Sequence, residues 1–79
     1  MTNEEILQQI YDETLVGNKP AVVELTSLGI EAEIPPNTLL FEALIPALEE
    51  VGARFERGDF FVPEMLISGR AMTGALELL

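Results

Sequence analysis

The sequence contains no histidine and no cysteine among its 79 residues. Without an imidazole, the chain offers no histidine general base, no histidine metal ligand and no Ser-His triad. Without a thiol, it forms no disulfide, no thiolate metal site and no cysteine nucleophile. Chemistry carried by this chain alone would depend on carboxylates, hydroxyls, Lys19 or Tyr11. We therefore predict that it holds no catalytic residue and no metal ligand.

Basic residues are also scarce, with 4 of them against 14 acidic residues and a formal net charge of −10. This charge repels phosphate backbones and anionic lipid surfaces, so we expect neither a nucleic acid nor a membrane as partner. The opening sequence MTNEEILQQI has neither the basic start nor the apolar run of a signal peptide. The absence of cysteine is compatible with a reduced compartment, and we predict a cytoplasmic location.

Apolar residues make up 48% of the chain and recur at helical spacing. A length of 79 residues corresponds to one domain. No run of useful length alternates apolar and polar residues, so no strand is predicted. The predicted fold class is all-α, and the predicted architecture is an antiparallel four-helix bundle formed by the single domain 1–79.

Capping signals define the first two helices. Thr2 and Glu5 fit a capping box for a helix over residues 3–15. Gly17 is suited to the left-handed conformation that ends many helices. Asn18 then begins a second helix, with Pro20 in the first turn where a missing N–H is harmless. This second helix must end before the pair Pro35-Pro36.

Two longer helices follow. The third begins near residue 36 and ends near residue 57, and we expect Pro46 to kink it rather than break it, because the apolar stripe continues beyond it. Gly58 and Asp59 form the next turn. The fourth helix begins near Pro63 and is predicted to run to the last residue without a cap, which we interpret as a domain boundary or a truncation. One of its faces should carry Phe61, Met65, Met72, Leu76 and Leu79.

The most informative segment is EEVGARFERGDFFVPEMLISGRAM, residues 49–72. Phe55 lies in the last turns of the third helix, Val62 enters the fourth, and Met65 and Leu66 lie one turn further. Because these helices are antiparallel neighbours, the four side chains should gather as an apolar patch beside the turn. Apolar residues at helical spacing are ordinarily core. The other interpretation is a docking surface for a flat apolar ligand. We also expect Gly52 and Gly69 to permit close helix approach.

The segment resembles the signature of the helical cap domain in cobalamin-dependent methionine synthase and in corrinoid proteins of methanol, methylamine and O-demethylase methyltransferase systems. The matching residues are Gly52, Phe55, Glu56, Gly58, Phe60, Phe61, Val62, Pro63, Glu64, Met65 and Leu66. Upstream, Val16-Gly17-Asn18 and Leu44-Ile45-Pro46 are similar to two further family motifs. The sequence departs from the family where Val62 stands for a frequent leucine and Glu33 for an expected glycine, and Pro35 is unusual.

The resemblance implies a cap that covers the upper face of a cobalamin (corrinoid) cofactor. Phe55 and Val62 would press on the methyl ligand of cobalt, with Met65 and Leu66 beside them. The lower cobalt ligand in this family is a histidine of an Asp-x-His-x-x-Gly motif on a following Rossmann-like domain. That motif is absent here, so the implied partners are a Rossmann-like B12-binding domain and the methyltransferase proteins it serves. The isolated patch should also favour a homo-oligomer.

Other function classes remain open. A helical protein-interaction module would share the fold and the apolar patch. A sensor cap of a B12-dependent regulator would be expected to carry Trp and often a Glu-His pair, which this sequence lacks. An acyl-carrier-like protein would need a serine at a helix start, usually as Asp-Ser-Leu, and neither Ser27 nor Ser68 fits. A stand-alone enzyme is the least favoured, because acidic runs of this kind are usually solvated helix faces.

Overall fold

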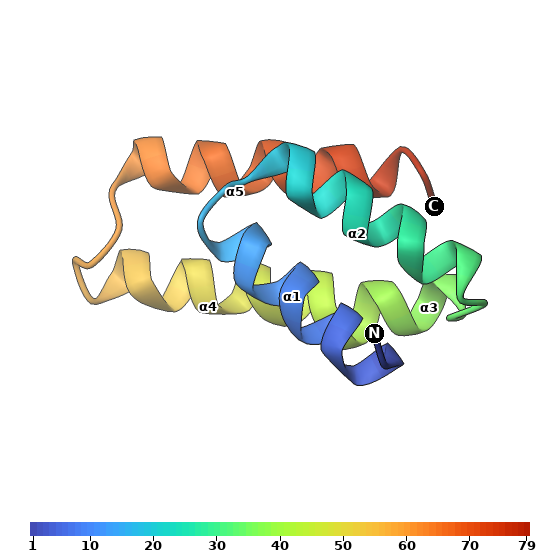
Figure 1. The fold of residues 1–79 in the computed structure, drawn as a ribbon. Coiled ribbons are helices and arrows are strands. Elements are labelled where there is room, and N and C mark those ends of the chain that lie inside the picture. Colours follow the sequence, from blue (N-terminus) through green and yellow to red (C-terminus); the bar gives the residue numbers. More distant parts are fainter.

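A computed structural model describes residues 1–79 and contains helices but no strand. The helices are α1 (Asn3–Leu15), α2 (Lys19–Glu31), α3 (Pro36–Leu39), η1 (Leu40–Leu44), α4 (Ile45–Glu56) and α5 (Val62–Leu76). Figure 1 shows α3, η1 and α4 as one long rod, so the chain forms a bundle of four rods in which each runs opposite to the one before it. The predicted all-α fold and antiparallel four-helix bundle are confirmed.

Two helical hairpins make up the bundle. The α1–α2 hairpin packs on the α4–α5 hairpin through contacts of α1 with α4 and of α2 with α5. In Figure 1 these contacting helices run in the same direction, while α4 and α5 run in opposite directions. No helix combines the length and hydropathy needed to cross a bilayer.

Three helices end in the same hydrogen-bonded motif, in which one residue adopts a left-handed conformation. Gly17, Glu33 and Gly58 have φ values of 74°, 63° and 82°. After α2, the amide of Glu33 donates to the carbonyl of Ile30 and the amide of Ile34 donates to the carbonyl of Gly29, both at 3.0 Å. This is the Schellman arrangement. Glu33 therefore occupies a position that suits glycine, as the departure from the family pattern indicated.

The long rod passes Pro46 without breaking. Its distortion lies upstream of the proline, as the π-helical turn Leu40–Leu44. There the amide of Ile45 donates to the carbonyl of Leu40, a span of five residues. Proline removes one helical donor and its ring crowds the carbonyl four residues earlier. A wider turn relieves that crowding, so the expected kink takes the form of a π-bulge.

The core is a cluster at the end of the bundle that α3 closes. It consists of Ile6, Ile10, Val22, Leu25, Ile34, Leu39, Ala43, Leu44, Ala71 and Ala75. The contribution of α5 is a face of small residues, with Ser68, Ala71, Gly74 and Ala75 buried. The face predicted to carry the large residues is therefore mostly surface: Phe61, Leu76 and Leu79 are exposed, while Met72 packs against the core cluster. Small side chains let α2 approach closely and fill the space with its own residues.

The last helix also ends earlier than predicted. It stops at Leu76, and Glu77 caps it with an amide that donates to the carbonyl of Thr73 at 3.1 Å. The expectation that the chain ends within a helix was wrong, because short-range turn hydrogen bonds to Ala75 and Leu76 satisfy the last amides instead.

Candidate functional site

The predicted site residues lie at the opposite end of the bundle from the core. Phe55 is in the last turn of α4, Val62 is the first residue of α5, and Met65 and Leu66 follow one turn later. Phe55, Val62 and Leu66 are 44%, 57% and 55% exposed, and Met65 is half-buried. None of the four side chains is buried in the core.

This end of the bundle is open because the α4–α5 hairpin is longer at this end than the α1–α2 hairpin (Figure 1). Figure 1 shows the α4–α5 hairpin projecting beyond the turn that joins α1 to α2. The α1–α2 turn meets α5 at Ser68, whose buried hydroxyl donates to the carbonyl of Leu15 at 3.0 Å. Beyond that contact, residues 52–67 include no buried residue. Apolar side chains in this stretch thus have no helix of their own chain to cover them.

Two apolar residues at this open end were not in the predicted site. Phe61 is 65% exposed and Ile67 is 44% exposed. Phe61 is the N-cap of α5, and its amide donates to the carboxylate of Glu64 at 2.9 Å. Phe61 therefore precedes the helix in an extended conformation and is not part of the helical face assigned to it from sequence. The Pro63-Glu64 pair marks the start of this helix, so it is the sequence signal that could have shown that Phe61 lies outside the helix.

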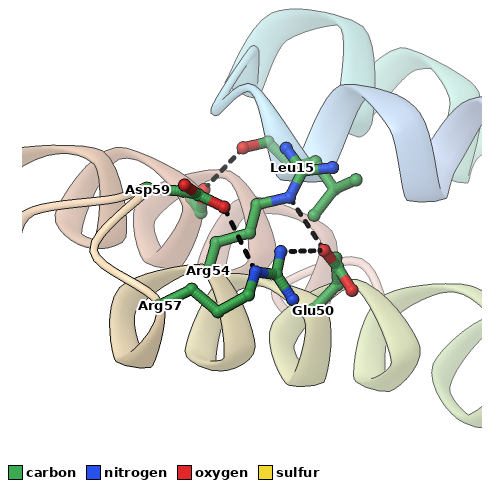
Figure 2. A network of polar contacts seen from close by, with 6 residues as sticks. Leu15, Glu50, Arg54, Arg57 and Asp59 are labelled. Atoms are coloured by element: carbon green, nitrogen blue, oxygen red, sulfur yellow. Dashed lines mark hydrogen bonds and ion pairs between the residues drawn. The ribbon is translucent and has the colours of Figure 1, made fainter.

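A network of charged residues lies at the end of α4 and in the loop that follows it (Figure 2). One carboxylate oxygen of Glu50 accepts from Arg54 Nε at 2.9 Å and from Arg57 Nη2 at 3.2 Å. Arg57 Nε in turn donates to Asp59 at 3.1 Å. The hydrogen bonds that Glu50 accepts from Arg54 and then Arg57 lower the pKa of Glu50, and those that Arg57 donates to Asp59 and then Glu50 raise the pKa of Arg57. The four-residue spacing of Glu50 and Arg54 could have predicted the first pair.

The expectation for Gly52 and Gly69 was wrong. A Cβ added at either position would meet no atom within 4 Å, so neither glycine mediates close helix approach. Close approaches occur at Gly17, where an added Cβ would overlap the side chain of Ile67, and at Gly74, where it would lie 2.9 Å from the Val23 side chain of α2. A surface pocket beside the site does include Gly69, and its other lining residues are Lys19, Met65, Leu66, Arg70 and Thr73. The pocket therefore places Met65 and Leu66 near two basic side chains, Lys19 and Arg70.

Known proteins share both the sequence and the fold of this chain. The family model described as "B12 binding domain" matches residues 6–79. The chain is 33% identical, over its full length, to monomethylamine corrinoid protein 2 of Methanosarcina acetivorans, and covers 36% of that protein. It is 32% identical to the dimethylamine corrinoid protein of Methanosarcina barkeri, of which it covers 37%. The chain thus spans just over a third of the length of these relatives.

A solved structure gives the same result in three dimensions. The monomethylamine corrinoid protein of Methanosarcina barkeri superposes on 99% of this chain with a TM-score of 0.94 and 29% sequence identity, and the match covers 37% of that protein. The family match over nearly the whole chain, the superposition and the exposed apolar end of the bundle agree. This chain belongs to the B12 binding domain family, as a helical domain whose cofactor is cobalamin.

Proposed function

We propose that this chain is the cap that shields the upper face of the corrinoid in a methyl-carrier protein serving a methyltransferase system. The observation that carries the proposal is the open end of the α4–α5 hairpin, where Phe55, Val62 and Leu66 remain largely exposed. A flat macrocycle is a ligand that such a face fits, because it covers apolar side chains without entering the core. Membership of the B12 binding family supports this choice of ligand.

An apolar cap would protect the cofactor by excluding water and oxidants from its upper face. Reduced cobalt is readily oxidised, so this exclusion by an apolar cover protects it. This chain has no histidine, so a histidine ligand on the lower face of cobalt would come from another domain. The proposal therefore includes a Rossmann-like B12-binding partner domain, methyltransferase proteins as the donors and acceptors, and a cytoplasmic location. The cap must move aside for methyl transfer.

The size of the contact can be worked out for Phe55. An aromatic side chain carries roughly 200 Å² of surface, and 44% of this side chain is exposed. Covering that part removes about 90 Å² from water, which stabilises the closed state by about 2 kcal/mol. Phe55→Ala should therefore shift the closed–open equilibrium by roughly tenfold or more. Because Phe55 is not part of the core cluster, the substitution should leave the fold intact.

The test joins residues 1–79 to the remainder of the Methanosarcina acetivorans monomethylamine corrinoid protein 2, in place of the aligned 36%. The loaded chimera is reconstituted with methylcobalamin, and its cobalt absorption spectrum and aerobic photolysis rate are measured. We expect faster photolysis in Phe55→Ala and Leu66→Ala. Phe41→Ala and Leu48→Ala are matched controls, because Phe41 and Leu48 are 61% and 45% exposed away from the open end.

The photolysis rates of the four variants distinguish a cap from other roles. Faster photolysis in the site variants and unchanged photolysis in the controls supports the cap role. If Phe55→Ala and Leu66→Ala behave as the unsubstituted chimera does, the face does not cover the corrin. Equal effects in all four variants would indicate a general helical interaction module instead.

Self-association of the isolated chain is part of the same proposal. Without a corrin to cover, the apolar residues at the open end should pair two copies. Sedimentation of the chain should show a concentration-dependent dimer that Phe55→Ala weakens and Phe41→Ala does not. A strict monomer at high concentration would contradict this.

A further inference from the structure

The α4–α5 hairpin must keep a defined shape although burial contributes little to it. Residues 57–61 connect the helices, and none of them is buried. Exposed apolar side chains on an unrestrained loop would collapse onto one another rather than present a face. Something other than core packing therefore has to hold this connection, and Arg54 is placed to do so.

The backbone of Arg54 anchors the connection. Its carbonyl accepts from the amide of Asp59 at 2.8 Å and from the amide of Phe60 at 3.1 Å. The amide of Gly58 donates to the carbonyl of Phe55 at 3.1 Å, and the left-handed φ of Gly58 turns the chain back toward α4. These bonds fix the path of the loop but leave the side chains that follow it free to turn.

The side chain of Arg54 adds the second restraint. Its guanidinium carbon lies 5.3 Å from the centre of the Phe60 ring. Its Nε donates to Glu50, which also accepts from Arg57, and Arg57 reaches Asp59. Figure 2 shows these side chains as a continuous chain of contacts from one turn of α4 to the loop. The two acids and two arginines balance in charge, so the network adds no net charge beside the apolar face.

We infer that Arg54, held by Glu50, is a positioning residue that keeps Phe60 against the hairpin and so leaves Phe55, Phe61 and Val62 directed outward as the ligand-covering face. The three phenylalanines near the connection differ in exposure, as this role requires. Phe60 is half-buried under the guanidinium, whereas Phe55 and Phe61 are 44% and 65% exposed. This inference rests on the proposed cap function, since it assigns how the same face is held in shape.

The first test needs no cofactor. In the NMR spectrum of the 79-residue chain, the Nε–H of Arg54 should show the ring-current shift of a group above an aromatic face, and Phe60→Leu should abolish it. Glu50→Gln should reduce the shift because Arg54 loses its ionic partner, whereas Glu49→Gln should not. Glu49 is the matched control, because it is the neighbouring exposed carboxylate and takes part in no ion pair. An unshifted Arg54 resonance in the unsubstituted chain would overturn the inference.

The second test uses the chimera loaded with methylcobalamin. Glu50→Gln should speed photolysis by about two- to fivefold, the equilibrium change expected from an exposed ion-pair network. Glu49→Gln should leave the rate unchanged, and Arg54→Lys should restore part of what Arg54→Ala loses, since lysine keeps the charge but not the planar stacking. Raising the salt concentration should bring the unsubstituted chimera toward the Glu50→Gln rate, because salt screens exposed pairs but not apolar contacts.

These outcomes distinguish the two ideas. If the unsubstituted chimera gives no protection from photolysis, the cap function fails while the Arg54 resonance still reports the hairpin. If the unsubstituted chimera protects and Glu50→Gln, Arg54→Ala and high salt leave that protection intact, the positioning role fails and the cap function stands.

Discussion

Replacing Gly17 by alanine tests how closely the α1–α2 turn approaches α5. The φ of Gly17 is 74°, a conformation that costs an L-residue about 1–2 kcal/mol. A Cβ at this position would overlap Cγ2 of Ile67 and lie 2.8 Å from its Cβ and 3.0 Å from its backbone carbonyl carbon. The turn must therefore move off α5, or α5 must shift.

The expected destabilisation combines three effects. Besides the backbone conformation, relief of overpacking costs about 1–3 kcal/mol. Movement of the turn also threatens the hydrogen bond from Ser68 to the carbonyl of Leu15, worth about 1 kcal/mol. Together these predict a loss of about 3–6 kcal/mol. A 79-residue chain has a total stability of about 4–12 kcal/mol, so Gly17→Ala should leave it near the unfolding threshold.

Gly58→Ala is the matched control. Gly58 has a φ of 82°, but an added Cβ would meet no atom within 4 Å. It should lose only the backbone contribution of about 1–2 kcal/mol. The assay is urea denaturation followed by far-UV circular dichroism, with both variants compared at the same temperature. Ile67→Ala should recover part of the loss when combined with Gly17→Ala. Equal destabilisation by the two glycine variants would refute the close approach at Ile67.

Three further changes test other parts of the molecule. Leu44→Ala removes a fully buried side chain of η1 and should lower the free energy of unfolding by about 2–5 kcal/mol in the same urea assay. Glu33→Gly should raise it by about 1 kcal/mol, because glycine adopts the left-handed conformation at that helix end without strain; an unchanged midpoint would contradict the φ of 63°. The pKa of Glu50 is lowered from its ordinary value of 4.5, so its ion-pair network should stabilise the hairpin above that pH. This stabilisation should be lost as the pH falls through the folded-state pKa of Glu50. In a side-chain NMR titration, Glu50 should therefore titrate below pH 4.5.

Helix starts were predicted well because their signals are local. Thr2 and Glu5 form the predicted capping box, with hydrogen bonds of 3.0 and 3.1 Å between them. Asn18 caps α2 through a bond to the amide of Ala21 at 3.4 Å. Each signal involves residues within one turn of each other, so no distant contact is needed to realise it. The left-handed ends at Gly17 and Gly58 follow from the same local logic.

The inward face of α5 could not be predicted in this way. Its large residues repeat at helical spacing and were expected to share one face, yet the residues that the structure buries are Ser68, Ala71, Gly74 and Ala75. The choice depends on how near α2 lies, and that distance is a property of the packed bundle. Large residues left on the other faces of α5 then become surface. The same inward face of small residues explains why Gly74 lies close to Val23 of α2, whereas an added Cβ at Gly52 or Gly69 would meet no atom.

The amino-acid sequence by itself determined the helical class, the turn positions and the family resemblance, since capping, periodicity and the motif of residues 49–72 are all carried by near neighbours along the chain. Only the tertiary structure decided that Phe55, Val62 and Leu66 face solvent rather than core. The reason is geometric: the α1–α2 turn meets α5 at Ser68, and the α4–α5 hairpin continues beyond it with no helix to cover its apolar side chains.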